Sequence, residues 1–231
     1  AFDAMAAVDS GAYSAFPFTA AIEASQVSAI LPGPYDLPAY RCSTVAVATN
    51  KTPQLPYRGV ARPGCCYAME VMIDAIARET GREPYEVRLA NLVGPEQMPY
   101  DNVTDKHFDS GDYPELLRRA VDAIDLESVR DRQKKGETDG RLIGLGISVF
   151  SEQTAHGTTA DGKRRAMHEQ AFARLTPDGR LDIRVGIQSI GQGLETTLAQ
   201  VAAERLGIDL PDIYVRLGDT EFSPYSSGAW G

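Results

Sequence analysis

Hydrophobic positions in the second half of the chain follow two periods, one typical of strands and one typical of helices. The apolar run "LIGLGISVF" at 142–150 has the length of a buried strand. Alternating apolar residues at 181–187 predict a strand with one buried face, and the turn "TPDGR" joins it to 168–175 as a hairpin. A helical period then runs from Leu194 to Gly207, and "DIYVRLGDT" predicts a further strand.

The first half of the chain reads mainly as helices after one strand. "STVAVATN" at 43–50 predicts the strand, and a loop rich in Pro and Gly leads from it to Pro63. Helical spacing then predicts a helix that ends near Gly81, where a C-terminal cap belongs. A short helix is expected from Pro84 and a third from Pro114. The apolar positions that carry these helices are Cys66, Met69, Ile73, Ile76, Ala77, Leu117, Val121 and Ile124.

The polar stretch "RQKKGETDGR" at 132–141 separates the helical region from the region dominated by strands. Polar segments of this kind are typical of domain boundaries. We therefore expect an α+β fold of two lobes, residues 1–136 and 137–231, with mixed or antiparallel sheets and packed helices.

Charge narrows the range of partners. The 231 residues carry a formal net charge of -9 and give a pI near 4.9. A phosphate backbone would be repelled by this excess of acid, so a nucleic-acid-binding function is not expected. The short basic clusters, at 134–135 and 163–165, are interpreted as solvated surface turns.

The three cysteines form neither a C-x-x-C redox motif nor a zinc-ligand pair, and their odd number favours a reducing compartment. No apolar run reaches the length of a membrane helix, and none resembles a signal peptide. Because the chain begins without Met and stops at "SSGAWG", it is interpreted as an internal part of a longer protein. A cytoplasmic location is expected, and a periplasmic one stays open.

Two stretches share the order strand, glycine-containing loop, helix: "PYRGVARPG" at 56–64 and "GIQSIGQGLETT" at 186–197. The unpaired amides and the positive dipole end of a helix N-terminus favour oxyanions and phosphates. Gln192 adds a carboxamide, and Arg58 adds a planar cation. Taken singly, each stretch is also compatible with an ordinary structural turn. Neither matches G-x-G-x-x-G or the phosphate loop.

Other catalytic arrangements lack support in the sequence. The histidines His107, His156 and His168 have no metal-ligand spacing, and the carboxylates show no evident acid–base pair. Direct ligation of a metal by the protein is therefore not expected. Gly-x-Ser-x-Gly is absent as well.

Taken together, the motifs resemble the molybdenum-binding large subunit of the molybdenum hydroxylases, the family of xanthine dehydrogenase and aldehyde oxidase. The resemblance runs in order through the whole chain. It rests on "DSGAY" (9–13), "GPYDLPAY" (33–40), "TN" (49–50), "PYRGVARP" (56–63), "RETGREPYEVRLANLV" (78–93), "DSGDY" (109–113), "GLGISVF" (144–150), "GQGLETT" (191–197) and "GDTEFSP" (218–224).

The resemblance implies a bound molybdenum–molybdopterin cofactor, in bacterial members often the cytosine dinucleotide form. It places the turn from Tyr57 through Arg58 to Gly59 against the oxygen and sulfur ligands of the metal. It also implies a second contact set for the pterin and phosphate portion. That set consists of Gly191, Gln192, Gly193, Ser226 and Ser227.

The resemblance also suggests which residues line the substrate pocket. At some positions this chain departs from the family pattern. Val60 stands where xanthine-type members carry an aromatic residue, and Gln26 stands near the place of their substrate-orienting Arg, so purine specificity is not expected. Cys42 lies in "YRCS", the tetrapeptide that holds copper in carbon monoxide dehydrogenase, but the framework puts the metal loop at 57–59 instead. The predicted substrate-lining residues are Val60, Val149, Phe150 and Ser151, with Glu152 as a further candidate. Val149 could equally fill the core.

The resemblance implies a hydroxylase or dehydrogenase component that oxidises an aldehyde or an N-heterocycle with water as the oxygen source. The family's catalytic glutamate is expected beyond Gly231, so no catalytic residue is assigned here and the chain alone is expected to be inactive. Iron–sulfur and FAD groups are expected on partner subunits or domains. The alternative is a non-catalytic binding or assembly module that retains the fold.

Overall fold

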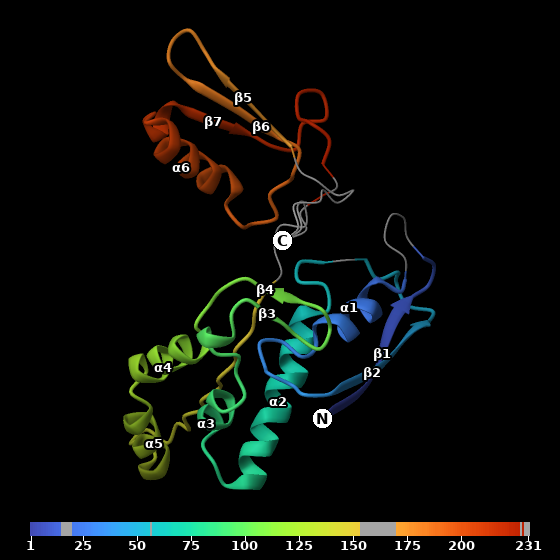
Figure 1. Ribbon diagram of the computed structural model, residues 1–231, viewed down its shortest axis with the longest axis vertical. Helices are drawn as coiled ribbons and strands as arrows, with labels where there is room; N and C mark the ends of the chain where they lie inside the picture. Colours follow the sequence, from blue (N-terminus) through green and yellow to red (C-terminus); the bar gives the residue numbers. More distant parts are fainter. Residues whose placement is uncertain (15–19, 56, 153–169, 227, 229–231) are drawn as a thin grey trace. The chain divides into compact units, whose positions relative to one another are not determined.

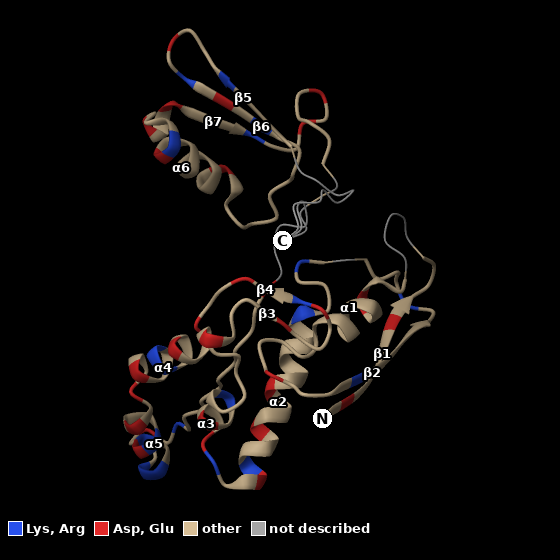
Figure 2. Ribbon diagram, viewed as in Figure 1, with Lys and Arg blue, Asp and Glu red and all other residues tan. Residues whose placement is uncertain are grey.

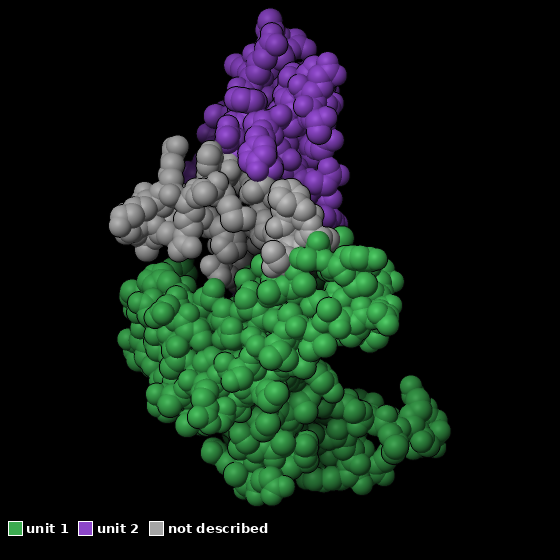
Figure 3. All heavy atoms as spheres, turned by 90° about the vertical axis from the view of Figure 1, so that its right-hand side faces the viewer, with its two compact units in different colours: residues 1–151 green, residues 152–231 purple. Residues whose placement is uncertain are grey.

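The computed structural model describes residues 1–14, 20–55, 57–152, 170–226 and 228, and it divides into two compact units (Figures 1 and 3). Unit 1 is Ala1–Ser151 and unit 2 is Glu152–Gly231. The division falls after Ser151 and not at the predicted position between 136 and 137. Residues before Ser151 belong to unit 1 because Val149 is buried in its core and the Ile147 carbonyl is bound there.

Unit 1 begins with a parallel pair of strands that lies beside one helix. Strand β1 (Phe2–Gly11) pairs with β2 (Tyr40–Ala48), and α1 (Ile22–Ile30) connects them, as parallel strands require a crossover. Strand β2 is the strand predicted at 43–50. The sequence pattern did not reveal β1 or α1.

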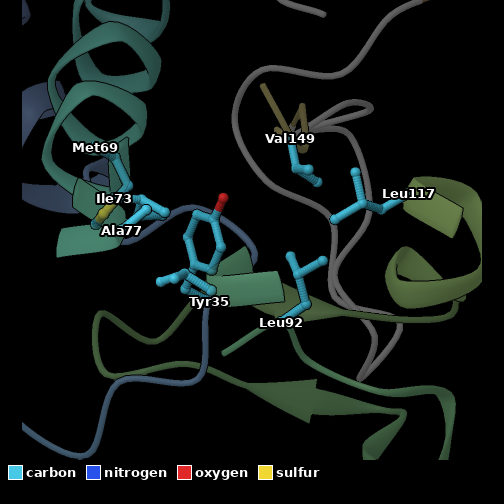
Figure 4. Packing of buried hydrophobic residues seen from close by; sticks show 8 residues of the cluster. Tyr35, Met69, Ile73, Ala77, Leu92, Leu117 and Val149 are labelled. Atoms are coloured by element: carbon cyan, nitrogen blue, oxygen red, sulfur yellow. The ribbon is translucent and has the colours of Figure 1, made fainter. Parts of the chain in front are cut away.

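Helix α2 (Arg62–Thr80) is the long helix predicted from Pro63 to Gly81, and it organises the core of unit 1. It ends at Gly81 in the left-handed conformation, as its helical spacing predicts. Helix α3 (Pro84–Leu89) follows and confirms the short helix expected from Pro84. Figure 4 shows the core between these elements, with Tyr35 beside three side chains of α2. The cluster contains Tyr35, Met69, Ile73, Ala77, Val87, Leu92, Leu117 and Val149.

Arg88 of α3 is fully buried and ties this core together. All of its guanidinium nitrogens are hydrogen-bonded: Nε donates to Glu70 (2.7 Å), and Nη1 donates to Asp74 (2.8 Å) and to the Pro84 carbonyl (3.0 Å). Nη2 donates to the carbonyls of Glu70 (3.3 Å) and Ile147 (2.8 Å). Burial opposes the charged form, yet the hydrogen bonds to the two carboxylates raise the pKa of Arg88 above its usual value.

Short elements complete unit 1. They are η1 (Pro95–Gln97), the antiparallel pair β3 (Tyr100–Asp101) and β4 (His107–Phe108), and the helices α4 (Tyr113–Ala123) and α5 (Leu126–Lys135). Helix α4 is the third predicted helix, and Asp112 caps it by accepting from the Glu115 amide (2.9 Å). Figure 2 shows acidic and basic residues interleaved on α4 and α5.

The strand predicted at 142–150 is not formed: these residues have no β-ladder partner in the described chain. Their burial still alternates, with Val149 buried and its neighbour Phe150 exposed. Side chains take the place of a neighbouring strand, because Arg88 binds the Ile147 carbonyl and Gln133 donates to the Ile143 carbonyl (3.0 Å). The apolar run at 142–150 therefore packs against the helices of unit 1 and does not join a sheet of the described residues.

Unit 2 is a three-stranded mixed sheet with one helix packed on it. Strands β5 (Ala171–Leu175) and β6 (Leu181–Val185) form the predicted hairpin, and β6 runs parallel to β7 (Ile213–Arg216). Helix α6 (Leu194–Leu206) and the short η2 (Leu210–Asp212) connect β6 to β7. The core consists of Leu181, Ile183, Val185, Ala199, Ala202 and Ile213. The α+β fold expected from the sequence is thus confirmed.

None of the helices in the described ranges combines the length and the apolarity needed to cross a bilayer.

Candidate functional site

In unit 1 the predicted site lies on the turn that opens α2. The Val60 amide donates to the Tyr57 carbonyl (3.0 Å), and the Arg62 amide donates to the Gly59 carbonyl (3.0 Å), so the turn closes on itself. Arg58 is exposed at its tip. The amides of Arg58 and Gly59 donate to no acceptor among the described residues. This turn therefore presents free N–H groups and a guanidinium together.

The backbone of this turn is left-handed over three consecutive residues. The φ angles are +102° at Gly59, +30° at Val60 and +63° at Ala61. Glycine adopts such angles readily, and a Cβ on Gly59 would also lie 3.0 Å from the Pro63 ring. A β-branched residue such as Val60 is strained at positive φ, and strain of this kind is typical of functional sites.

The predicted substrate wall at 149–151 is anchored beside the second turn of α2. Cys66 Sγ lies 3.1 Å from the Ser148 hydroxyl, and Arg88 holds the Ile147 carbonyl. Val149 points into the core cluster, near Leu117 and Leu92 in Figure 4. Phe150 is 62% exposed and is the residue of this segment that offers an aromatic surface. The substrate-lining role of these residues stays a prediction.

In unit 2 the predicted cofactor turn lies between β6 and α6. Gly191 and Gly193 have φ angles of +103° and +72°, and Gly193 is the N-cap of α6. Gln192 Oε1 accepts from the Ile190 amide (2.6 Å), which braces the turn and leaves the carboxamide nitrogen exposed. The amides of residues 191–193 donate to no acceptor in the described ranges.

A second loop, residues 217–226, follows the parallel strand β7 and reaches the end of β6. A Cβ on Gly186 would strike the Pro224 carbonyl and lie 2.7 Å from Ser226 Cβ. A Cβ on Gly218 would strike the Gln188 side chain, whose Cδ would be 3.0 Å away. Parallel strands bring their carboxyl ends to one edge, where α/β sheets commonly bind ligands. The two glycines are therefore the places where the two loops touch.

The polar face of the sheet holds the second loop. The Arg184 guanidinium lies 5.5 Å from the centre of the Phe222 ring and also donates to Asp182 (2.8 Å). Arg216 pairs with the other oxygen of Asp182 (3.0 Å). Hydrogen bonds from Arg184 lower the pKa of Asp182. This chain of contacts keeps the 217–226 loop over β6.

Ser226, the predicted cofactor residue on this loop, accepts through its hydroxyl from the Gly228 amide (3.0 Å). Its O–H is still able to donate to a ligand. Ser223 on the same loop has a buried hydroxyl without a partner in the described chain. Ser227, the other predicted residue, lies outside the described residues.

The residues of each unit fit an anionic, hydrogen-bonding cofactor. Free amides, left-handed glycines and hydroxyls suit phosphate and pterin oxygens, and nothing lies within 4 Å of a Cβ built on Gly193. The structure thus divides the predicted cofactor residues into two sets, 57–59 in unit 1 and 191–193 with Ser226 in unit 2. Within the described ranges no three His, Cys, Asp or Glu side chains are grouped to hold a metal ion.

Cys65 in the first turn of α2 is expected to resist alkylation in the full protein. It is 5% exposed, and burial raises the pKa of its thiol to about 11. The reactive thiolate is then scarce at pH 8, about 100-fold scarcer than for an ordinary thiol. Because the folded pKa is raised, the rate should climb as the pH rises toward 11. Labelling with iodoacetamide followed by peptide mass spectrometry checks this, with the partly exposed Cys66 as internal reference. Equal labelling of both at pH 8 would contradict it.

Known proteins are similar to this chain in sequence and in fold. Two family profiles, both described as molybdopterin cofactor-binding domain, match residues 1–92 and 119–231. The large subunit of nicotine 6-hydroxylase from Paenarthrobacter nicotinovorans is 35% identical over 230 residues, 98% of this chain and 28% of that protein. The chain belongs to the molybdenum-hydroxylase large subunits.

Two further relatives support the assignment of this chain to the molybdenum hydroxylases. The carbon monoxide dehydrogenase large chain of Afipia carboxidovorans is 34% identical over 87% of this chain and 26% of its own length. The crystal structure of quinoline 2-oxidoreductase from Pseudomonas putida 86 superposes with a TM-score of 0.86 at 36% identity, over 97% of this chain and 29% of that one. The chain thus spans between a quarter and a third of the length of these relatives.

The structure bears on the copper alternative as well. Cys42 lies inside β2, paired with Ala4 of β1, and not on an exposed turn. The turn at 57–59, where the resemblance places the metal loop, has Gly59 in the position that the cysteine occupies in Tyr-Arg-Cys-Ser.

Sequence reasoning missed several residues that shape the site. Glu23 and Arg88 act on segments 38 and 59 residues away in sequence, which no local pattern reveals. A signal did exist for Arg88, since it is the one charged residue in the mainly apolar stretch "VRLANLV" at 87–93. Gly186 and Gly218 were visible as glycines in strand ends, a position that marks close backbone approach.

Proposed function

We propose that this chain forms part of the molybdenum–pterin site of a hydroxylase that oxidises an N-heterocycle or an aldehyde with water as the oxygen source. The observation that carries the proposal is the pair of helix-opening turns, 57–61 and 190–193, each with free amides and left-handed glycines. The names of the relatives, nicotine 6-hydroxylase and quinoline 2-oxidoreductase, support an N-heterocycle as the first substrate class to test.

The unit 1 turn would bind anionic oxygen close to the metal. The amides of Arg58 and Gly59 supply donors, and the exposed guanidinium of Arg58 supplies a fixed positive charge. The backbone can approach closely at Gly59 because no side chain intervenes. Tyr57 is 87% exposed and offers an aromatic ring and a hydroxyl beside these donors.

The unit 2 turn would hold the pterin and phosphate portion. The amides of residues 191–193 and the carboxamide nitrogen of Gln192 are donors without a described acceptor. The dipole of α6 adds partial positive charge at Gly193. Ser226 would donate from the neighbouring loop.

The cofactor supplies the oxidation of the substrate carbon when it is bound. The residues of this chain would bind and orient the cofactor and the substrate. Phe150 would stack against a planar substrate because its ring is exposed on an anchored segment, and aromatic rings pair favourably with one another. Val60 leaves more room at its position than an aromatic residue would.

The finer assignments rest on the family resemblance. We propose the cytosine dinucleotide form of the cofactor and partner subunits or domains that carry iron–sulfur clusters and FAD. The names of the relatives, "large subunit" and "large chain", support an assembly of several subunits. The three free cysteines favour a cytoplasmic location. Metal and flavin analysis of the complex, purified from the cytoplasmic fraction, tests these assignments together.

Turnover by the full protein with its partners tests the proposed reaction. Quinoline and nicotine are offered in one series and benzaldehyde in another, in water enriched with ¹⁸O and with an artificial electron acceptor. We expect a hydroxylated heterocycle that carries ¹⁸O from water. Oxidation of benzaldehyde alone would move the assignment to the aldehyde class. An enzyme that contains molybdenum yet oxidises neither class would overturn the proposed reaction.

Gln192 variants separate bracing of the turn from donation to the cofactor. Gln192→Glu keeps the Oε1 acceptor for the Ile190 amide but removes the donor, whereas Gln192→Ala removes both. Leaving the cofactor acceptor without its donor costs about 1 to 3 kcal/mol, so Gln192→Glu should already retain the cofactor at least about five-fold more weakly. Gln192→Ala should lose more than Gln192→Glu if the brace to the Ile190 amide also matters, and the same amount if only donation does. Molybdenum and pterin content after dialysis measures the loss. Wild-type content in Gln192→Ala would refute the role given to this side chain.

A further inference from the structure

The left-handed run from Gly59 to Ala61 needs support from outside itself. Two of its three residues carry a Cβ, and Val60 is β-branched. Such residues persist at positive φ only where surrounding groups hold them. Ala61, the N-cap of α2, offers no capping side chain, so the support must come from another segment.

Glu23 in the first turn of α1 provides that support. Its Oε1 accepts a hydrogen bond from the Ala61 amide (2.9 Å), across 38 residues of sequence. The first turn of α2 contains no acidic residue of its own and begins with Arg62. A carboxylate at this place satisfies an orphan amide and complements the helix dipole, the role that a capping residue usually plays from within the helix.

Packing fixes α1, and therefore Glu23, against the start of α2. Val27 and Ile30 of α1 lie against the small buried cluster that contains Ala61 and Cys65. Figure 1 shows α1 beside the N-terminal end of α2. The charge of Glu23 also contributes to the raised pKa of Cys65, after burial and Cys42, which places the carboxylate close to this turn. Glu23 is thus held where it meets the turn.

We propose that Glu23 is a positioning residue that locks the 59–61 turn in its left-handed conformation and so presents the Arg58 and Gly59 amides to the anionic cofactor. The inference rests on the proposed function of that turn. Because the Ala61 amide is occupied by Glu23 and the Val60 amide by the Tyr57 carbonyl, the backbone donors left for the cofactor at this turn are the amides of Arg58 and Gly59. Arg62 assists from within, since its Nη1 donates to the Gly59 carbonyl (3.3 Å).

Three variants of the full protein test this role. Glu23→Ala removes the acceptor, Glu23→Gln retains an uncharged acceptor, and Glu23→Ala combined with Val60→Gly removes the acceptor but relieves the strain. Glu127→Ala is the matched control, because Glu127 is also an acid in the first turn of a helix, α5, and is exposed. Hydrogen exchange of the peptide that covers 58–66 and molybdenum retention after dialysis are the readouts.

Glu23→Ala should speed exchange at the Ala61 amide about ten-fold, the effect of one lost hydrogen bond, and should lower molybdenum retention by a similar factor. Glu23→Gln should recover most of both, the double variant should recover retention, and Glu127→Ala should change neither. Wild-type exchange and retention in Glu23→Ala would overturn the proposal. Equal losses in Glu23→Gln and Glu23→Ala would also overturn it, because an acceptor at this position would then not be what matters.

The two readouts separate this inference from the proposed function. If the wild-type protein holds no molybdenum while Glu23→Ala still speeds exchange at 58–66, the cofactor assignment fails and the locking of the turn stands. If molybdenum is present and Glu23→Ala leaves exchange unchanged, the proposed function stands and Glu23 does not lock the turn.

Discussion

Replacement of Arg88 by methionine is expected to destabilise unit 1 by about 3 to 5 kcal/mol, because it leaves buried charge without a partner. The guanidinium is fully buried, so without it the buried Glu70 carboxylate would keep only its hydrogen bond from the Tyr35 hydroxyl (2.6 Å), and the partly exposed Asp74 would lose its ion pair. Methionine fills much of the volume but supplies none of the five hydrogen bonds. Native-state hydrogen exchange of the α2 and α3 amides in the full protein measures the loss.

Two comparisons isolate the cause of this loss. Arg119→Met removes an exposed i,i+4 pair with Glu115, and such pairs contribute about 0.3 to 0.5 kcal/mol. A triple variant, Arg88→Met with Glu70→Gln and Asp74→Asn, should regain part of the stability, because no buried charge is then left alone. A loss in Arg88→Met no larger than that in Arg119→Met would contradict the account of the core.

Gly186→Ala is expected to destabilise unit 2 by about 1 to 3 kcal/mol, the range seen for overpacked sites. The added methyl group would strike the Pro224 carbonyl and Ser226, and backbone cannot yield as a flexible side chain does. The displaced segment carries Ser226, so cofactor retention should fall as well. Hydrogen exchange of β6 and molybdenum content report the two effects.

Gly144→Ala is the control for this substitution. Gly144 has no heavy atom within 4 Å of a built Cβ and no positive φ, so the change should stay within about 0.5 kcal/mol. If Gly186→Ala proves as mild as Gly144→Ala, the close approach of the two loops in unit 2 is not the constraint described here.

Periodicity predicted the elements whose partners are local. Helices α2 and α6 have apolar residues at helical spacing and a glycine at the C-terminal end, and the β5–β6 hairpin has its turn residues in place. Strand β1 escaped notice because its sequence, "FDAMAAVDSG", alternates mainly through alanine, which gives a weak hydrophobic signal. Its partner β2 lies beyond α1, so pairing could not be read locally.

The segment 142–150 shows that a hydrophobic pattern does not make a strand when no neighbouring strand among the described residues is available to pair with it. Its burial alternates as the apolar run predicts, yet a strand requires a neighbouring backbone to bond with. Here the Ile143 and Ile147 carbonyls are bound by the side chains of Gln133 and Arg88. Arg88 belongs to α3, which the sequence predicted, whereas Gln133 belongs to α5, which the sequence did not predict. Both contacts depend on tertiary packing.

The sequence predicted the two turns of the candidate site but not the distant residues that hold those turns in place. The two strand-to-helix junctions, with Arg58 and Gln192, follow from glycine placement and helix physics. Glu23 is separated from its contact by a whole strand and a loop, and the contact of Gly186 with Ser226 spans a helix and a strand. Such contacts are set by packing, which a single sequence does not display.

The cofactor content of the full protein tests the central claim most directly. The protein is purified with its partner subunits from cells that load related enzymes, and molybdenum is measured by elemental analysis alongside the fluorescence of the oxidised pterin. We expect about one molybdenum and one pterin per chain, since the cofactor carries one metal on one pterin. Protein that folds and assembles under those conditions yet contains neither would contradict it.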